Sequence, residues 1–323
     1  MPAKTTATQI LDFANKPKSG KAIIARGLFK QYDKDAPTHQ ALKAVDIDVP
    51  IGCVYGLLGP NGAGKSTFIN IMAGTVIKTG GMVSIWGTDI DENPRQARAN
   101  IGIVPQELNI DSFFTPRETL DMMAGLFGVP KSERHTDEIL NVIGLTEQAD
   151  LYSRRLSGGM RRRLLVGKAM VHRPPILVLD EPTAGVDVAL RRRLWDSIKS
   201  LNRAGVTVVL TTHYLEEAEA LCDQIAIINQ GTVVAAESKN DLLAKVGQKT
   251  LHLTLKKPPT MPLPNALCKI GAQWRNNRLS IRFDPTNNNA INLLNIVKDA
   301  GLCVLDFSTT EPDLEEVFIS LTK

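Results

Sequence analysis

The chain has 323 residues, of which 43% are hydrophobic and 22% are charged, and its formal net charge is +4. This composition is ordinary for a globular protein, and the length favours two domains. The mild positive charge is spread along the chain and does not indicate nucleic-acid binding. No apolar run approaches the roughly 18–20 residues of a membrane-spanning helix, and the scattered cysteines, with no C-x-x-C pair, disfavour a metal or redox site.

The N-terminal region leads from a polar tail into strands. Residues 1–20 show no sustained periodicity, so we expect a flexible tail. Strand-like runs follow at residues 22–25 and 44–49. Tyr32 lies between them, and its ring is a candidate either for stacking on a nucleobase or for local surface packing.

A glycine-rich loop at residues 59–67 organises the rest of the chain. It matches G-x-x-x-x-G-K-[ST], with an apolar run before it and a helix-forming run after it. Such a loop turns several backbone N–H groups and the positive end of a helix toward an anion, which is typical of phosphate binding. The predicted nucleotide-binding residues are Gly59, Pro60, Asn61, Gly62, Ala63, Gly64, Lys65, Ser66 and Thr67.

Two extended runs follow the loop and its helix, at residues 82–86 and 101–104. The second run ends just before Gln106. We predict that Gln106 approaches a metal ion and a water molecule that attacks the bound phosphate. Phe113 and Phe114 come shortly afterwards and are expected either to line a groove or to fill a local core.

Two helix starts are clear in the next part of the chain. Thr115 is predicted to cap a helix with Pro116 at its first position and Glu118 at its third. Ser157 is predicted to cap another, within the segment Leu156-Ser157-Gly158-Gly159-Met160.

Polar residues then follow two apolar strands. Asp180 and Glu181 end a run that begins at Ile176, and His213 follows a run at residues 206–210. Strands that alternate with helices predict an α/β fold with a mostly parallel sheet, whose chemistry lies at the carboxyl ends of the strands. Downstream of a phosphate-binding loop, Asp180 is a candidate Mg²⁺ ligand and Glu181 a candidate general base. His213 is expected to contact the γ-phosphate.

The composition changes after about residue 243. Strands are predicted at residues 279–283 and 302–307, on either side of a helix at 290–300. The last segment has an amphipathic helical pattern formed by Leu314, Val317, Phe318 and Leu321. We therefore expect a small C-terminal α/β domain at 241–323 with no recognisable chemistry.

The order of these motifs resembles that of ATP-binding cassette (ABC) ATPases over about residues 22–240. The segment Leu156-Ser157-Gly158-Gly159-Met160 is similar to the signature that is specific to this family, and Asp187 follows a Gly-Val turn as in the family's D-loop. Two departures are Met160, where glutamine is commonest, and Val186, where leucine is usual. The resemblance implies an ATP-binding domain at 21–240 with a helical subdomain at about 107–165.

The resemblance also implies roles for residues. Lys65, Gln106, Glu181 and His213 would be catalytic, and Ser66, Gln106 and Asp180 would hold Mg²⁺. In the family, the signature residues Ser157, Gly158 and Gly159 bind the γ-phosphate of ATP held by the other subunit. The expected cofactors are therefore ATP and Mg²⁺, and a homodimer is expected.

Two segments, residues 311–318 and 211–218, resemble ATPase subunits of drug, lipid and polysaccharide exporters. This resemblance implies a separate multi-helix membrane permease as partner. It also implies a cytoplasmic protein, peripheral on the cytoplasmic face of the inner membrane.

Other functions remain open at this point. The main alternative is a soluble ABC ATPase acting on the ribosome or on nucleic acid, although the chain has one phosphate loop and one signature, with no room for a long insertion between them. A nucleotide-binding regulator without hydrolysis and an importer ATPase are further alternatives. The runs Arg161–Arg163 and Arg191–Arg193 are interpreted as solvated helix faces rather than as a nucleic-acid patch.

Overall fold

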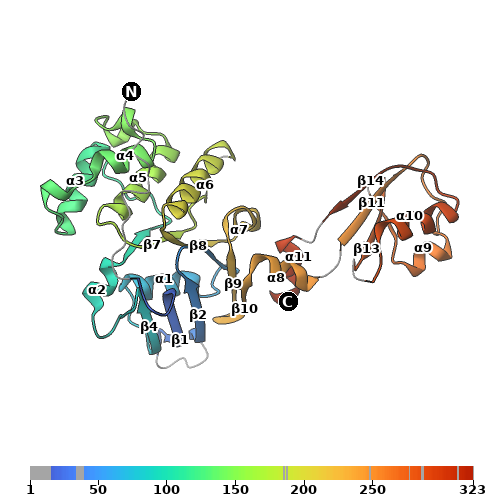
Figure 1. The fold of residues 1–323 in the computed structure, drawn as a ribbon, viewed down its shortest axis with the longest axis horizontal. Helices are drawn as coiled ribbons and strands as arrows, with labels where there is room; N and C mark the ends of the chain where they lie inside the picture. The colour runs from blue at the N-terminus through green and yellow to red at the C-terminus, as the bar shows by residue number, and fades with distance from the viewer. Residues whose placement is uncertain are drawn as a thin grey trace. The chain divides into compact units, whose positions relative to one another are not determined.

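The glycine-rich loop follows β3 (Val54–Leu58), an inner strand of the largest sheet in the computed structural model (Figure 1). The structure describes residues 16–33, 40–184, 186, 188–246, 249–275, 277–284, 287–310 and 313–322. The chain divides into two compact units, Met1–Ser238 and Lys239–Lys323.

The largest sheet of the first unit has six strands in the order β10-β9-β3-β8-β7-β6. Neighbouring strands from β9 to β6 pair in parallel, and β10 is antiparallel to β9. Besides β3, its strands are β6 (Ile101–Val104), β7 (Ile176–Asp180), β8 (Thr207–Thr212), β9 (Gln224–Asn229) and β10 (Thr232–Ser238). All side chains of β3 and β8 are buried, as expected for parallel strands that are covered on both faces.

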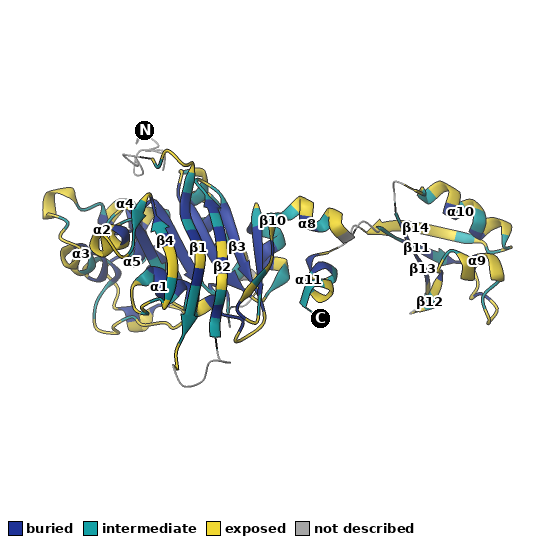
Figure 2. Ribbon diagram, turned by 90° about the horizontal axis from the view of Figure 1, so that it is seen from below, coloured by how far each residue is buried: buried dark blue, intermediate teal, exposed yellow. Residues whose placement is uncertain are grey.

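An antiparallel sheet packs on the same core, in the order β2-β1-β4-β5. Its strands are β1 (Lys21–Gln31), β2 (Gln40–Pro50), β4 (Gly80–Ile85) and β5 (Thr88–Asp89). Figure 2 shows both buried and exposed residues along β1 and β2. The apolar side of α1 (Lys65–Ala73) contributes Phe68, Ile71 and Met72 to this core, so the loop before α1 is anchored on both sides.

Three helices form a separate cluster, which Figure 1 shows apart from β1, β2 and β4. They are α3 (Pro116–Leu126), α4 (Thr136–Val142) and α5 (Gly158–Met170). Their shared core includes the fully buried Leu120, Leu140, Leu145 and Leu164. The remaining helical segments of this unit are α2 (Pro94–Ala99), α6 (Val188–Arg203), α7 (Leu215–Leu221) and the 3-10 turns Lys131–Glu133, Thr146–Gln148 and Ser153–Arg155.

The second unit contains a four-stranded antiparallel sheet in the order β12-β13-β11-β14. The elements of this second unit are α8 (Lys239–Val246), β11 (Lys249–Leu255), α9 (Asn265–Lys269), β12 (Gln273–Arg275), β13 (Arg278–Phe283), α10 (Ala290–Asp299), β14 (Val304–Thr310) and α11 (Leu314–Thr322). The order from β11 to β14 is β-α-β-β-α-β, the split βαβ arrangement. One face of the sheet shares a core with α9 and α10.

The predicted α/β class with a mostly parallel sheet is confirmed. The predicted strands before and after the glycine loop are also present, whereas β5, β10, β11 and β12 were not predicted. No helix in the described part of the chain has the length and apolar character needed to cross a membrane.

Candidate active site

The glycine loop has the tight backbone that its sequence predicted. Gly62 and Gly64 have φ values of +79° and +110°, a region that residues with side chains rarely adopt. Gly59 has no space for a side chain, because a Cβ atom there would lie 2.2 Å from the Ile228 carbonyl oxygen. Glycine is therefore required at these positions for the loop to close and for α1 to begin at Lys65.

Lys65 points back into this loop. Lys65 is 6% exposed, and its Nζ donates hydrogen bonds to the carbonyl oxygens of Gly59, at 2.7 Å, and Pro60, at 3.1 Å. Burial lowers the pKa of Lys65, and the negative charges of Glu181 and Asp180 oppose that shift. The ammonium group is thus held beside two carboxylates, where an anionic ligand would be attracted.

The carboxylates lie at the end of β7, as predicted. Thr211 Oγ1, on the neighbouring strand β8, donates to Asp180 Oδ1 at 2.6 Å and accepts from the Glu181 backbone N–H at 3.1 Å. One buried hydroxyl therefore fixes both the first carboxyl group and the backbone of the second residue.

The Glu181 carboxylate joins two residues that are distant in the sequence. Gln106 Nε2 donates to Glu181 Oε2 at 3.0 Å, and His213 Nδ1 lies 3.1 Å from Glu181 Oε1. The Glu181 side chain is 13% exposed, so one of its faces remains open to solvent. The structure thus brings together Gln106, Glu181 and His213 at the carboxyl ends of three adjacent strands.

Tyr32 lies next to the loop. Its hydroxyl is 3.3 Å from Thr67 Oγ1, and Lys30 Nζ is 4.7 Å from the centre of its ring. The residue is 59% exposed, so the ring is accessible to a ligand. Stacking on a nucleobase stays a prediction.

The signature segment forms a helix start. Ser157 caps α5, and its Oγ accepts a hydrogen bond from the Met160 N–H at 3.3 Å. A Cβ atom built on Gly158 would meet nothing within 4 Å. Across the described ranges, no hydrogen bond or ion pair connects the signature with the glycine loop, and Asp187 lies outside the described residues.

Arg162 is a residue of this site that sequence reasoning missed. It is 5% exposed, and its Nη1 donates to the carbonyl oxygens of Pro105, at 3.0 Å, and Gln106, at 2.8 Å. It therefore connects the signature helix α5 with the segment that carries Gln106. No sequence signal could identify this contact, because its partners lie more than fifty positions away.

The interpretation of Arg161–Arg163 as a solvated helix face is wrong. Arg161 donates to the carbonyls of Ser153 and Arg154, and Arg163 donates to those of Ile143 and Gly144. These guanidinium groups bind loop backbone within the chain. In the second run Arg192 and Arg193 are exposed, as predicted, whereas the Arg191 side chain is only 18% exposed and its Nη1 lies 3.8 Å from Glu216 Oε2.

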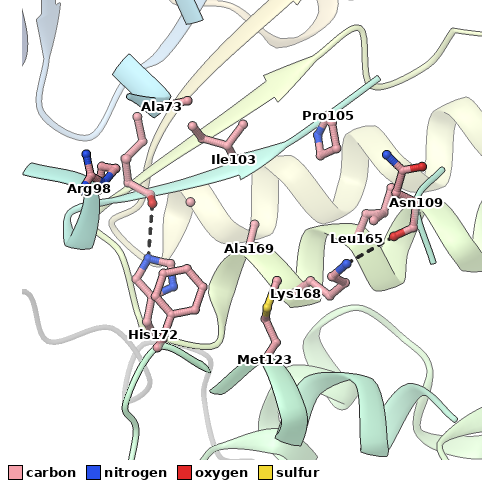
Figure 3. A pocket seen from close by; sticks show the side chains of 13 residues that line it. Ala73, Arg98, Ile103, Pro105, Asn109, Met123, Leu165, Lys168, Ala169 and His172 are labelled. Carbon is pink, nitrogen blue, oxygen red and sulfur yellow. Dashed lines mark hydrogen bonds between the residues drawn. The ribbon is translucent and has the colours of Figure 1, made fainter. Parts of the chain in front are cut away.

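A mostly apolar pocket of about 500 Å³ lies between β6, α3 and α5 (Figure 3). Lys168 and Arg98 are at its edges, and Lys168 Nζ donates to the Asn109 carbonyl oxygen at 3.2 Å. Its lining consists of Ala73, Arg98, Ile101, Gly102, Ile103, Pro105, Asn109, Met123, Phe127, Leu165, Lys168, Ala169 and His172.

One wall of the pocket is a pair of stacked rings. The Phe127 and His172 rings stack with 3.9 Å between their centroids, and His172 Nε2 lies 3.2 Å from the Ile101 carbonyl oxygen. Burial lowers the pKa of His172 to about 4, so the imidazole is neutral at physiological pH. Phe113 is 73% exposed and does not line this pocket, so the expectation that it fills a local core is wrong, whereas its place in a partner-binding groove stays a prediction.

Comparison with known proteins agrees with the geometry. Residues 42–184 match the family model described as ABC transporter. The linearmycin resistance ATP-binding protein LnrL of Bacillus subtilis (strain 168) is 38% identical over 71% of this chain and 73% of its own length. The daunorubicin/doxorubicin resistance ATP-binding protein DrrA of Streptomyces peucetius is 35% identical over 94% of this chain and 92% of its own.

Solved structures are similar in the same region. A structure described as an ATP-binding subunit of an ABC transporter has a TM-score of 0.61 and 26% identity, over 70% of this chain and 93% of that one. A dimeric bacterial ABC transporter cassette has a TM-score of 0.59 and 27% identity, over 67% and 98% of the two chains. The glycine loop, the acidic strand end and these likenesses agree: the chain belongs to the ABC transporter family, as one of its ATP-binding and ATP-hydrolysing subunits.

Proposed function

We propose that this chain is the ATPase subunit of an exporter, in which Glu181 is the general base for ATP hydrolysis. The convergence of Gln106 and His213 on the two oxygens of one carboxylate carries this proposal. The relatives named for linearmycin and daunorubicin resistance support export rather than import. The transported molecule is recognised elsewhere, since the site described above is suited to a nucleotide.

In the proposed reaction, Glu181 accepts a proton from water as the water oxygen attacks the γ-phosphorus of ATP. The bond from that phosphorus to the bridging oxygen breaks, which yields ADP and phosphate. Lys65 and the loop N–H groups stabilise the negative charge on the phosphates. Gln106 and His213 orient the carboxylate through its two oxygens, and Tyr32 is proposed to contact the adenine ring.

The donor atoms near the loop fit a magnesium ion. Ser66, Gln106 and Asp180 offer hydroxyl, amide and carboxylate oxygens, the ligands that this hard cation prefers. Within the described ranges, no group of three His, Cys, Asp or Glu residues could hold a metal by itself, so phosphate oxygens would complete the coordination. When bound, the ion would neutralise phosphate charge. The Thr211 bond that fixes Asp180 would keep its carboxylate oriented toward the ion.

A comparison of Lys65→Ala with the parental chain tests the nucleotide site. Loss of the ammonium group should weaken ATP binding itself and abolish hydrolysis, because Lys65 Nζ lies inside the loop, where its charge would attract the phosphates. Fluorescent-ATP titration measures the binding, and phosphate release measures the hydrolysis. Parental ATP affinity in Lys65→Ala would contradict the assignment.

We propose further that the pocket beside α3 and α5 receives a short helix from a separate membrane subunit, at the cytoplasmic face of the inner membrane. An apolar helix face would fit Met123, Phe127 and Leu165, and an acidic residue on that helix would face Lys168 or Arg98, which lie on different sides of the pocket. The family to which the chain belongs supports this occupant, as does the lack of a described helix able to cross a membrane.

Two neighbouring residues at the end of α3 offer a matched test of this docking, since α3 ends at Leu126 and Phe127 follows it. Phe127→Ala should prevent co-purification with a co-expressed membrane subunit while it leaves basal ATP hydrolysis intact, because Phe127 lines the pocket. Leu126→Ala is the control, since Leu126 is 76% exposed and lies outside the lining. Equal co-purification of both variants would contradict the proposed docking site.

A further inference from the structure

The segment that carries Gln106 has little regular structure of its own. Residues 105–109 are exposed, and they follow β6 without forming a helix or a strand. The Gln106 side chain nevertheless holds its Nε2 atom 3.0 Å from Glu181 Oε2. A side chain on an exposed, irregular segment keeps one orientation only when the backbone beneath it is restrained by another part of the chain.

The helix α5 provides that restraint. Arg162 Nη1 donates to the carbonyl oxygens of Pro105, at 3.0 Å, and Gln106, at 2.8 Å. Later on the same helix, Lys168 Nζ donates to the Asn109 carbonyl oxygen at 3.2 Å (Figure 3). Among the described residues, these two side chains form all the hydrogen bonds that join the backbone of residues 105–109 to another helix or strand. Arg162 is the one that acts at Gln106 itself.

Packing alone does not account for an arginine at this position. Arg162 Nε is buried and makes no hydrogen bond within the described ranges, and burial lowers the pKa of the guanidinium group. The described ion pairs do not include this group. A buried cation without an opposite charge usually destabilises a fold relative to an apolar side chain of similar size. The two carbonyl contacts are therefore the interactions that offset this cost.

We propose that Arg162 is a positioning residue for ATP hydrolysis, which fixes the Gln106 backbone so that the Gln106 amide orients the Glu181 carboxylate. This inference rests on the proposed roles of Gln106 and Glu181. Both steps are direct hydrogen bonds, at 2.8 Å from Arg162 to the Gln106 carbonyl oxygen and at 3.0 Å from Gln106 Nε2 to Glu181. Within the described residues, Arg162 bonds neither Glu181 nor the glycine loop, so its effect on the reaction is indirect.

Arg162→Met provides the central test. Methionine is unbranched, apolar and favourable in helices, so it should fill the buried space on α5 while it removes both hydrogen bonds. We expect kcat for ATP hydrolysis to fall roughly tenfold to a hundredfold, because a released Gln106 no longer holds the Glu181 carboxylate in place. KM for ATP should stay within about twofold of the parental value, since the glycine loop is unchanged.

Arg163→Met is the matched control. Arg163 Nη1 also donates to two carbonyl oxygens, those of Ile143, at 2.7 Å, and Gly144, at 2.8 Å. The two variants therefore lose the same kind of contact from adjacent positions of one helix. The loop that Arg163 holds makes no described hydrogen bond with Gln106 or Glu181. The kcat of Arg163→Met per folded molecule should thus equal that of the parent, even where its thermal midpoint falls.

A double-mutant cycle with Gln106→Ala separates positioning from a general structural role. Gln106→Ala should itself lower kcat, because it removes the amide that binds Glu181. Arg162→Met added to Gln106→Ala should slow hydrolysis no further, since both changes remove one support of the same carboxylate. Losses of kcat that multiply in the double variant would overturn the inference, because Arg162 would then act by another route.

The remaining outcomes distinguish this inference from the proposed function. A parental kcat for Arg162→Met beside a slow Gln106→Ala would overturn the positioning role alone. If Arg162→Met does not fold, Arg162→Gln replaces it, because glutamine ends two bonds short of the Nη1 position, and a parental kcat there would overturn the inference. A parental kcat for Gln106→Ala would overturn the role of Gln106 and this inference with it. A parental rate for Glu181→Gln would overturn the proposed function itself.

Discussion

Glu181 has a backbone conformation that few residues with side chains adopt. Its φ is +45°, and its N–H is directed to Thr211, which also binds Asp180. A residue in this region of backbone space stores a small amount of strain, and such strain is common where a side chain must be aimed. Here the turn after β7 directs the carboxylate toward Gln106 and His213.

Sequence motifs predicted Lys65, Gln106, Glu181 and His213 because each follows the end of a strand or a glycine turn. These local patterns can be recognised in the sequence alone, without knowledge of the fold. Arg162 had no such signal, since an arginine in a helix is normally a surface residue. Its contacts depend on which distant backbone groups the fold brings against it.

His172 predicts a measurable dependence of stability on pH. Its pKa is about 4 in the folded chain and about 6.5 in an exposed imidazole, so the unfolded chain binds its proton first as the pH falls. Stability should therefore be lost between pH 6.5 and 4, by at most about 3 kcal/mol. His172→Phe, which keeps a ring against Phe127, should flatten this dependence in urea unfolding measured at pH 6.5 and 4.5.

His135→Gln is the control for that experiment, because His135 lies at the surface beside Glu138. An unchanged difference between the two pH values in His172→Phe would show that His172 does not titrate in this way.

Among the elements, the strands with continuous apolar runs were predicted well and those of the C-terminal unit less well. β7 and β8 are buried along their whole length, except at Asp180. Their runs of apolar residues therefore identify them as strands in the sequence. β11 alternates buried leucines, Leu251, Leu253 and Leu255, with polar residues, a short strand pattern that the proline-rich segment after it obscures. β12 has three residues and no pattern to detect.

The capping box of α3 predicts a local change in stability. Thr115 Oγ1 accepts the Glu118 N–H at 3.2 Å, and Glu118 Oε2 accepts the Thr115 N–H at 2.9 Å. Thr115→Ala should cost about 1 kcal/mol and increase hydrogen exchange in the first turns of α3. Basal ATP hydrolysis should remain parental, because α3 does not contact Glu181.

Thr115→Ser keeps the capping oxygen and is the control for this change. Exchange in Thr115→Ala that is no faster than in Thr115→Ser would show that the cap contributes little to α3.

For the whole molecule, the described residues show no hydrogen bond or ion pair between the signature and the glycine loop. Ser157 and Gly158 present a helix start with free space around it, and the described contacts do not connect them with Lys65. We predict a homodimer in which the signature of one copy faces ATP held by the other. One of the similar solved structures is itself described as dimeric.

Gly158→Ala tests this arrangement directly. A Cβ atom at Gly158 meets nothing within 4 Å of this chain, so the thermal midpoint should stay parental. The added methyl group would obstruct ATP on the partner, so hydrolysis should fall at least about tenfold while ATP binding to the glycine loop persists.

Gly167→Ala provides the contrast, because a Cβ atom there would lie 2.8 Å from Ile143 Cδ1 and should destabilise the fold instead. If Gly158→Ala hydrolyses ATP at the parental rate, the signature does not contact nucleotide in the proposed way.

The most direct measurement is the ATP turnover of Glu181→Gln under saturating Mg-ATP, together with its ATP affinity. Glutamine keeps the size of the side chain but cannot accept the proton from water. The account predicts that hydrolysis falls by roughly 10²–10⁴-fold, with ATP affinity unchanged and an ATP-bound dimer that accumulates on size-exclusion chromatography. Turnover at the parental rate would contradict the account and would move the base to His213 or Gln106.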